Sequence, residues 1–134
     1  MNIQDMAGRL NRANGEADTA LERIRSNPHA DREWIENCLR NYIASKLLLD
    51  EEEISDNIVE MVRINVSKAS HISVEELKKM DRPGACGSAP TVLAKRVLLY
   101  IGIQNALGIT FPARELPDVR TVQELTDMIL KLIR

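Results

Sequence analysis

Aromatic residues, cysteines and long apolar runs are all scarce in this 134-residue sequence. Two cysteines, Cys38 and Cys86, are too few for a disulfide framework or a cysteine-rich zinc site. No uncharged apolar stretch reaches the roughly 18 residues that a membrane-spanning helix needs. The first 25 residues have no apolar core of the kind found in a secretory signal. We therefore expect a soluble protein of the cytoplasm.

Charge of one sign is not in excess either. The chain has 18 Lys and Arg against 20 Asp and Glu, which gives a net charge of −2. A protein that binds nucleic acid through its phosphates usually carries a basic excess, so that class is disfavoured. The 44% hydrophobic content is too high for a disordered chain and sufficient for a buried core.

The apolar residues that are present recur at helical spacing in the first half of the chain. A thin stripe predicts a helix over residues 2–26, with a break at Asn14-Gly15 and an end before Pro28. A second helix is predicted over 31–49, and a third begins after an N-cap at Ser55 or Asp56. The predicted inward positions of the second and third helices are Trp34, Ile35, Cys38, Leu39, Tyr42, Ile43 and Leu47, and Ile58, Val62, Val66 and Ala69.

The second half has clearer helix boundaries. Capping boxes begin at Ser73 and at Thr121, and each predicts the start of a helix. Between them lies a loop over 81–90 that is rich in Gly and Pro. An apolar helix over 91–107, ended by Gly108, follows it, and an extended connector over 109–119 comes next. The last helix is predicted to bury Val122, Leu125, Met128, Ile129 and Leu132. No strand alternation is found, so the fold class is predicted to be all-α.

The end of the chain, LGITFPARELPDVRTVQELTDMI over residues 107–129, resembles the C-terminal half of acyl and peptidyl carrier proteins. Upstream, ISDNIVEMVRINVSKASHISVEEL over residues 54–77 is similar to the first helix of that family and the turn after it. The resemblance implies a carrier-like helical bundle over 55–134 with the apolar helix at its centre. Residues 1–54 lie outside the resemblance and are predicted to form an added helical hairpin.

The resemblance also implies a function. Carrier proteins hold an acyl or aminoacyl intermediate as a thioester on a 4′-phosphopantetheine arm for partner synthases, as in fatty acid or polyketide biosynthesis. A phosphopantetheinyl transferase attaches the arm to a serine at the start of the second helix, where backbone N–H groups and the helix dipole favour the phosphate. The carrier itself catalyses nothing. The implied partners are therefore a transferase and synthase or ligase enzymes.

The attachment motif of the family, Asp-Ser-Leu, is not present. The corresponding segment reads GACGSAP over residues 84–90, and Ser88 is the candidate attachment site. Counting back from Pro112 without gaps places Leu93 at the serine position, and Thr91 is the other nearby hydroxyl. Ser88 as a simple helix N-cap is the alternative to the arm. Direct loading of cargo on Cys86 is a further alternative.

The apolar helix differs from the acidic second helix that carriers present to partner enzymes. It contains no acid and begins with Lys95-Arg96, which we predict to contact a partner enzyme. From Val97 to Ile103 it is apolar all round, which is typical of a helix buried on more than one side. The hairpin, with Trp34 and Tyr42, or a second copy of the chain would cover it.

Two other functions remain open from sequence. The chain could be a degenerate carrier without the arm that acts as an interaction or scaffold module, or an unrelated helical adaptor. Catalysis is not expected: Cys86 and His71 lack an orienting third residue. His29 and His71 lack the acids that would complete a metal site.

Overall fold

The protein is built from helices. The structure, a computed structural model, describes residues 3–80 and 90–133. Its helices are α1 (Ile3–Ser26), α2 (Arg32–Leu47), α3 (Ile58–Ser70), α4 (Val74–Met80), α5 (Pro90–Leu107) and α6 (Val122–Ile133). Two short 3₁₀ turns, η1 (Glu51–Glu53) and η2 (Leu116–Asp118), lie between them. Within these ranges there is no strand, and the predicted all-α fold is confirmed.

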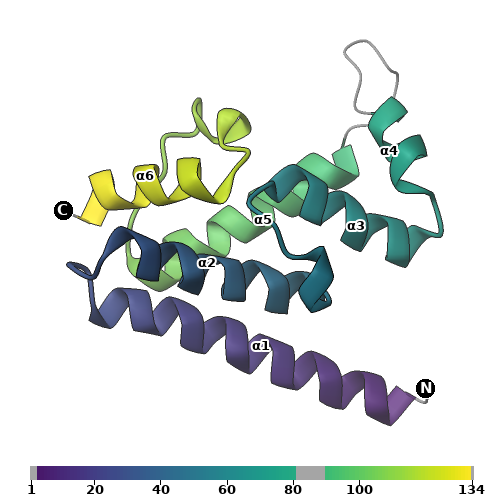
Figure 1. Ribbon diagram of the computed structural model, residues 1–134, viewed down its shortest axis with the longest axis horizontal. Helices are drawn as coiled ribbons and strands as arrows, with labels where there is room; N and C mark the ends of the chain where they lie inside the picture. Colours follow the sequence, from purple (N-terminus) through teal and green to yellow (C-terminus); the bar gives the residue numbers. More distant parts are fainter. Residues whose placement is uncertain (1–2, 81–89, 134) are drawn as a thin grey trace.

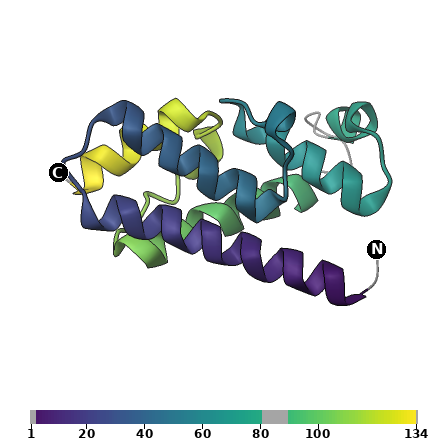
Figure 2. The ribbon, with the colours of Figure 1, turned by 60° about the horizontal axis from the view of Figure 1, so that its bottom comes forward.

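The helices share one hydrophobic core. Helices α1 and α2 run antiparallel and side by side, and α5 packs against α1 (Figures 1 and 2). Helix α6 packs against α2, whereas α3 packs against α5, α2 and α4. Buried side chains from all six helices and from the connector before α6 form a single cluster. The predicted boundary between residues 54 and 55 stays a prediction, because the segments on its two sides contribute to the same core.

Helix α2 supplies the centre of this core. Six of its predicted inward residues are at most 4% exposed: Ile35, Cys38, Leu39, Tyr42, Ile43 and Leu47. The prediction for Trp34 is wrong, because its side chain is 37% exposed. Trp34 lies in the first turn of α2, at the edge of the apolar face that Ile35 and Cys38 define. Its indole is therefore left at the surface.

Helices α3 and α6 begin side by side. An isolated antiparallel bridge joins Asn57 to Thr121, with Ile58 N donating to the Arg120 carbonyl and Val122 N to the Asp56 carbonyl, both at 2.8 Å. The N-cap of α3 is Asn57, whose Oδ1 accepts from Glu60 N at 2.9 Å. The predicted cap at Ser55 or Asp56 is wrong because the bridge keeps the chain extended through Asn57.

Three other predictions about helix details need correction. The predicted break at Asn14-Gly15 is wrong, because α1 is continuous through both residues, which are exposed. Ala69 and Leu132, predicted to face inward, are exposed. Their helices use other positions instead, including Met61 in α3 and Thr126 in α6, both fully buried. The Thr126 hydroxyl is satisfied by donating to the Val122 carbonyl at 2.8 Å.

Candidate functional site

The predicted attachment site precedes α5. Ser88 and Cys86 lie outside the described residues, so the structure does not test the arm or the alternative of cargo on Cys86. Helix α5 begins at Pro90, two positions after Ser88 in the sequence. Leu93, the residue reached by gap-free counting, is 40% exposed in the first turn and offers no hydroxyl. Attachment at Ser88 stays a prediction.

Lys95 connects α5 to neighbouring helices. Its Nζ donates to Asn65 Oδ1 at 2.7 Å, and Asn65 Nδ2 donates to the Leu47 carbonyl at 2.9 Å. The ammonium group, which is partly buried, therefore links α5 through α3 to the end of α2. The predicted partner contact at Lys95 stays a prediction, and the structure gives this side chain an internal partner.

Arg96 is 5% exposed and holds the connector in front of α6. Its Nη2 donates to the carbonyls of Pro117 at 3.0 Å and Val119 at 2.9 Å, while its Nε has no hydrogen-bond partner among the described residues. Tyr100 Oη donates to the same Val119 carbonyl at 2.6 Å, and burial raises the pKa of Tyr100. A partner contact at Arg96 stays a prediction, and its Nη2 is bonded within the chain.

The C-terminal end of α5 is fixed by the same connector. Gly108 ends the helix with a φ of 67°, a left-handed conformation that favours glycine. Gln104 Oε1 then accepts from Phe111 N at 2.7 Å, and the Phe111 ring meets Tyr100 edge to face at 6.4 Å. Helix α5 and the connector therefore form one hydrogen-bonded unit.

The N-terminal hairpin covers the inner side of α5 through Tyr42. Tyr42 Oη donates to the Leu99 carbonyl at 2.9 Å, and burial raises the pKa of Tyr42 to about 12. The hydroxyl reaches α5 over Gly102, where an added Cβ would clash with Tyr42 Oη. The predicted cover by Tyr42 is confirmed, and that by Trp34 is not. The sequence patterns did not single out Gly102, although a lone glycine between Ile101 and Ile103 is its signal.

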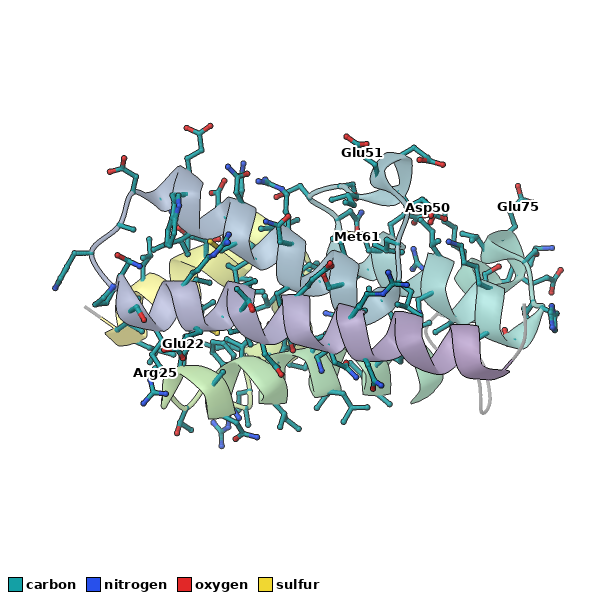
Figure 3. All side chains as sticks on the ribbon, turned by 90° about the horizontal axis from the view of Figure 1, so that it is seen from below. Glu22, Arg25, Asp50, Glu51, Met61 and Glu75 are labelled. Atoms are coloured by element: carbon teal, nitrogen blue, oxygen red, sulfur yellow. The ribbon has the colours of Figure 1, made fainter. Side chains whose placement is uncertain are left out.

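The opposite side of α5 is open. We call it the outer strip, and its exposed residues are Leu93, Ala94, Leu98, Ile101 and Asn105. Leu98 is 65% exposed and Ile101 39%, and the strip contains three of the five exposed large hydrophobic residues in the described ranges. Figure 3 shows side chains of α5 projecting away from the body along its lower edge, with Glu22 and Arg25 of α1 nearby. Within one chain, α5 is therefore uncovered along this strip, and the alternative of cover by a second copy stays a prediction.

A groove lies elsewhere, between α1 and α2. Its volume is about 840 Å³, and its walls include Arg12, Glu16, Arg23, Asn41 and Ser45 together with several small residues. Cys38 is not among its lining residues, and burial raises the pKa of that thiol. His71, the other residue considered for catalysis, is exposed at the C-cap of α3. Neither Cys38 nor His71 therefore lines the groove.

Neither a metal centre nor a membrane span is found in the described ranges. No group of three or more His, Cys, Asp or Glu residues there is arranged to hold a metal ion. In the same ranges, the helices are too short or too polar to cross a bilayer. Comparison with known proteins finds no matching family model, no matching curated protein and no matching solved structure.

Proposed function

We propose that this protein is a carrier-like domain that tethers an acyl or aminoacyl intermediate for partner enzymes through a phosphopantetheine arm on Ser88. The observation that carries the proposal is the order of elements around α5. A helix of 18 residues starts two positions after the candidate serine, and a connector and a capped final helix follow it. The order agrees with the sequence resemblance to carrier proteins.

The chain's own residues would serve this function by fixing the position of α5 relative to the other helices. Tyr42 binds its inner side, Lys95 ties it to α3, and Arg96 ties it to the connector. A helix fixed in this way presents a constant N-terminus to a transferase and to synthases. Phosphopantetheine, when attached, supplies the thiol that forms the thioester. We expect this to take place in the cytoplasm, without nucleic acid and without catalysis by the domain itself.

The test is covalent loading. The purified protein is incubated with a promiscuous phosphopantetheinyl transferase and coenzyme A, and its intact mass is measured. We expect a gain of one arm that is lost in Ser88→Ala and kept in Thr91→Ala, which removes the other nearby hydroxyl. No gain, with a positive-control carrier modified in the same tube, would rule out the tether. A gain in mass that Thr91→Ala removes would assign the attachment site to Thr91 instead.

A second function, an interaction module without the arm, is favoured by one specific observation. Helix α5 has no acid to present to carrier-recognising enzymes, and its outward face is apolar. The loading experiment separates the two functions. An unmodified protein that binds a synthase or ligase, and loses that binding on Leu98→Glu, would be a scaffold.

A further inference from the structure

We propose that this protein exchanges its N-terminal hairpin, α1 and α2, with a second copy of the chain, by straightening the hinge that joins α2 to α3. The hinge spans residues 48–57. In the exchanged dimer each hairpin packs on the later helices of the other copy, through the contacts that it makes within one chain. The proposal goes beyond the tethering function and does not depend on it.

The hinge begins with a backbone conformation that its residue disfavours. Leu48 directly follows α2 and has a φ of 53° and a ψ of 45°, in the left-handed region. A residue with a Cβ is sterically crowded there, and helices that end in this way usually place glycine at that position. The hinge therefore gains free energy when Leu48 returns to the right-handed region.

The sequence of the hinge contains no residue that would end a helix. It has no glycine or proline, and its first part, LLDEEE over residues 48–53, consists mainly of leucine and glutamate, which are strong helix formers. The last three of these residues already form the 3₁₀ turn η1. A right-handed Leu48 would let α2 continue to Glu53. That continuation lengthens α2 by about 9 Å and moves the hairpin away from its own later helices.

Side chains of α3 hold the hinge in its bent form. Asn65 Nδ2 donates to the Leu47 carbonyl at 2.9 Å, and in a continuous helix that carbonyl would accept from Glu51 N instead. The Lys68 ammonium group pairs with Glu53 and so fixes η1 against α3. The bent and the straight hinge therefore both satisfy the Leu47 carbonyl, each with a different donor.

The contacts of the hairpin identify a second copy as the partner. Tyr42 donates to the Leu99 carbonyl of α5, and Arg32 pairs with Asp127 of α6, so the surface that a straight hinge uncovers is shaped for this hairpin. A second copy brings the same hairpin, and each contact forms again between chains. Strained hinges favour such domain swapping, because only the hinge differs between the monomer and the dimer.

The first experiment measures exchange during refolding. The full chain is unfolded in urea and refolded at about 1 to 500 µM, a range that spans micromolar association, and monomer and dimer are separated by size-exclusion chromatography with light scattering. We expect a dimer whose yield rises with concentration. Leu48→Gly should lower the ratio of dimer to monomer at least about tenfold, because glycine accepts the bent hinge and disfavours the straight helix.

His71→Gly is the matched control for this substitution. His71 is the other non-glycine residue with a positive φ in the part of the chain that the structure describes, and it ends α3, outside the hinge. This variant relieves the same kind of conformation and should dimerise like the parent. Asn65→Ala acts in the opposite direction. It removes a donor that only the bent hinge needs at the Leu47 carbonyl, so the ratio of dimer to monomer should rise at least about fivefold.

The second experiment identifies the exchange itself. Arg32→Cys and Asp127→Cys chains, both in a Cys86→Ser background, are mixed, unfolded, refolded together and treated with a short bismaleimide. Exchange brings position 32 of one copy to position 127 of the other, so we expect a covalent dimer of the two variants. A mixture of Asn14→Cys and Lys46→Cys chains is the control. These two residues bond at 3.3 Å within the hairpin, so they stay in one copy and should give no link between chains.

Three results would overturn the proposal. The first is a parent protein that stays monomeric after refolding at every concentration. The second is a dimer whose yield Leu48→Gly leaves unchanged, and the third is a dimer that the mixture of Arg32→Cys and Asp127→Cys chains does not link. Arm loading is measured separately on the monomer, so the tether and the exchange can each fail alone.

Discussion

Tyr42 contacts α5 at Gly102, where a side chain on α5 would block the contact. The phenol is 1% exposed, and its Oη donates to the Leu99 carbonyl at 2.9 Å across the backbone of Gly102. A methyl group at Gly102 would clash with Oη, whereas ring atom Cζ lies at 3.6 Å, an ordinary contact distance. Glycine is otherwise unfavourable inside a helix by about 1 kcal/mol relative to alanine. The cost of Gly102 therefore depends on the hydroxyl of Tyr42.

This dependence predicts a change of sign. In the native background, Gly102→Ala should lower the free energy of unfolding, because it displaces a buried, hydrogen-bonded phenol. In a Tyr42→Phe background the clashing atom is gone, and the same change should raise stability by up to about 1 kcal/mol through helix propensity. Urea denaturation of the four proteins gives the coupling. Tyr42→Phe alone should cost about 1 kcal/mol for the lost hydrogen bond. Equal effects of Gly102→Ala in both backgrounds would contradict the contact.

The same phenol predicts a loss of stability in alkali. Tyr42 has its pKa raised from 10 to about 12 by burial, so between these values the unfolded chain releases the proton and the folded chain keeps it. The unfolded state then binds fewer protons, and the free energy of unfolding falls as pH rises. A shift of this size corresponds to roughly 2 kcal/mol near pH 12. We expect Tyr42→Phe to lose this component in urea titrations at pH 9 to 12, while other ionising groups cancel in the comparison. If the free energies of unfolding of the native protein and of Tyr42→Phe fall in parallel with pH, the assignment of this loss to Tyr42 is refuted.

At the scale of elements, the bridge between the starts of α3 and α6 joins two helices that are far apart in the sequence. Thr121 is part of the bridge and also caps α6, since its Oγ1 accepts from Glu124 N at 3.1 Å. Glu124 Oε1 accepts in return from Thr121 N at 3.1 Å. Thr121→Ala should therefore cost about 1 kcal/mol of unfolding free energy, whereas Thr121→Ser should be close to neutral. Thermal melts of the pair measure this. An alanine variant as stable as the serine variant would show that the cap contributes nothing.

Helix spacing and capping residues predicted the elements well, because both are local signals. The starts of α4 and α6 follow from Ser73 and Thr121, and the inward residues of α2 follow from its apolar period. The cap of α3 was not predictable from local sequence. The bridge to Thr121, 64 positions away, selects Asn57 over Ser55 and Asp56. Long-range pairing of this kind leaves no mark in the neighbouring residues.

The surroundings of α5 were only partly predictable for the same reason. An apolar sequence indicates how much of a helix can be buried but not how many neighbours pack against it. The apolar sequence of α5 therefore predicted that the outer strip would be covered. Arg96 reads as a surface residue in sequence, yet its burial depends on carbonyls of Pro117 and Val119 that the connector brings to it. Gly102 is visible in the sequence as a lone glycine in an apolar helix. The reason for a glycine there depends on the position of Tyr42, which the sequence does not give.

At the scale of the whole molecule, packing contacts cross the predicted boundary between residues 54 and 55. The resemblance to carriers begins near residue 55, whereas α6 packs against α2 and α5 packs against α1. The Arg32 side chain of α2 also pairs with Asp127 of α6 and donates to the Gln123 carbonyl at 3.2 Å. A hairpin added to a complete domain would leave that domain's core closed without it. Here the hairpin supplies core residues to the later helices.

The shared core predicts that residues 55–134 do not fold alone. Without residues 1–54, the shared core would lose Tyr42, Ile43 and Leu39, and apolar surface worth several kcal/mol at about 25 cal/mol per Å² would meet water. That loss is comparable with the whole stability of a small domain, about 5 to 15 kcal/mol. We expect the 55–134 fragment to show no cooperative thermal transition and narrow amide chemical-shift dispersion. Adding the 1–54 fragment should restore both, and a Leu39→Asp version of that fragment should not. A 55–134 fragment that unfolds cooperatively by itself would instead establish an autonomous domain with an accessory hairpin.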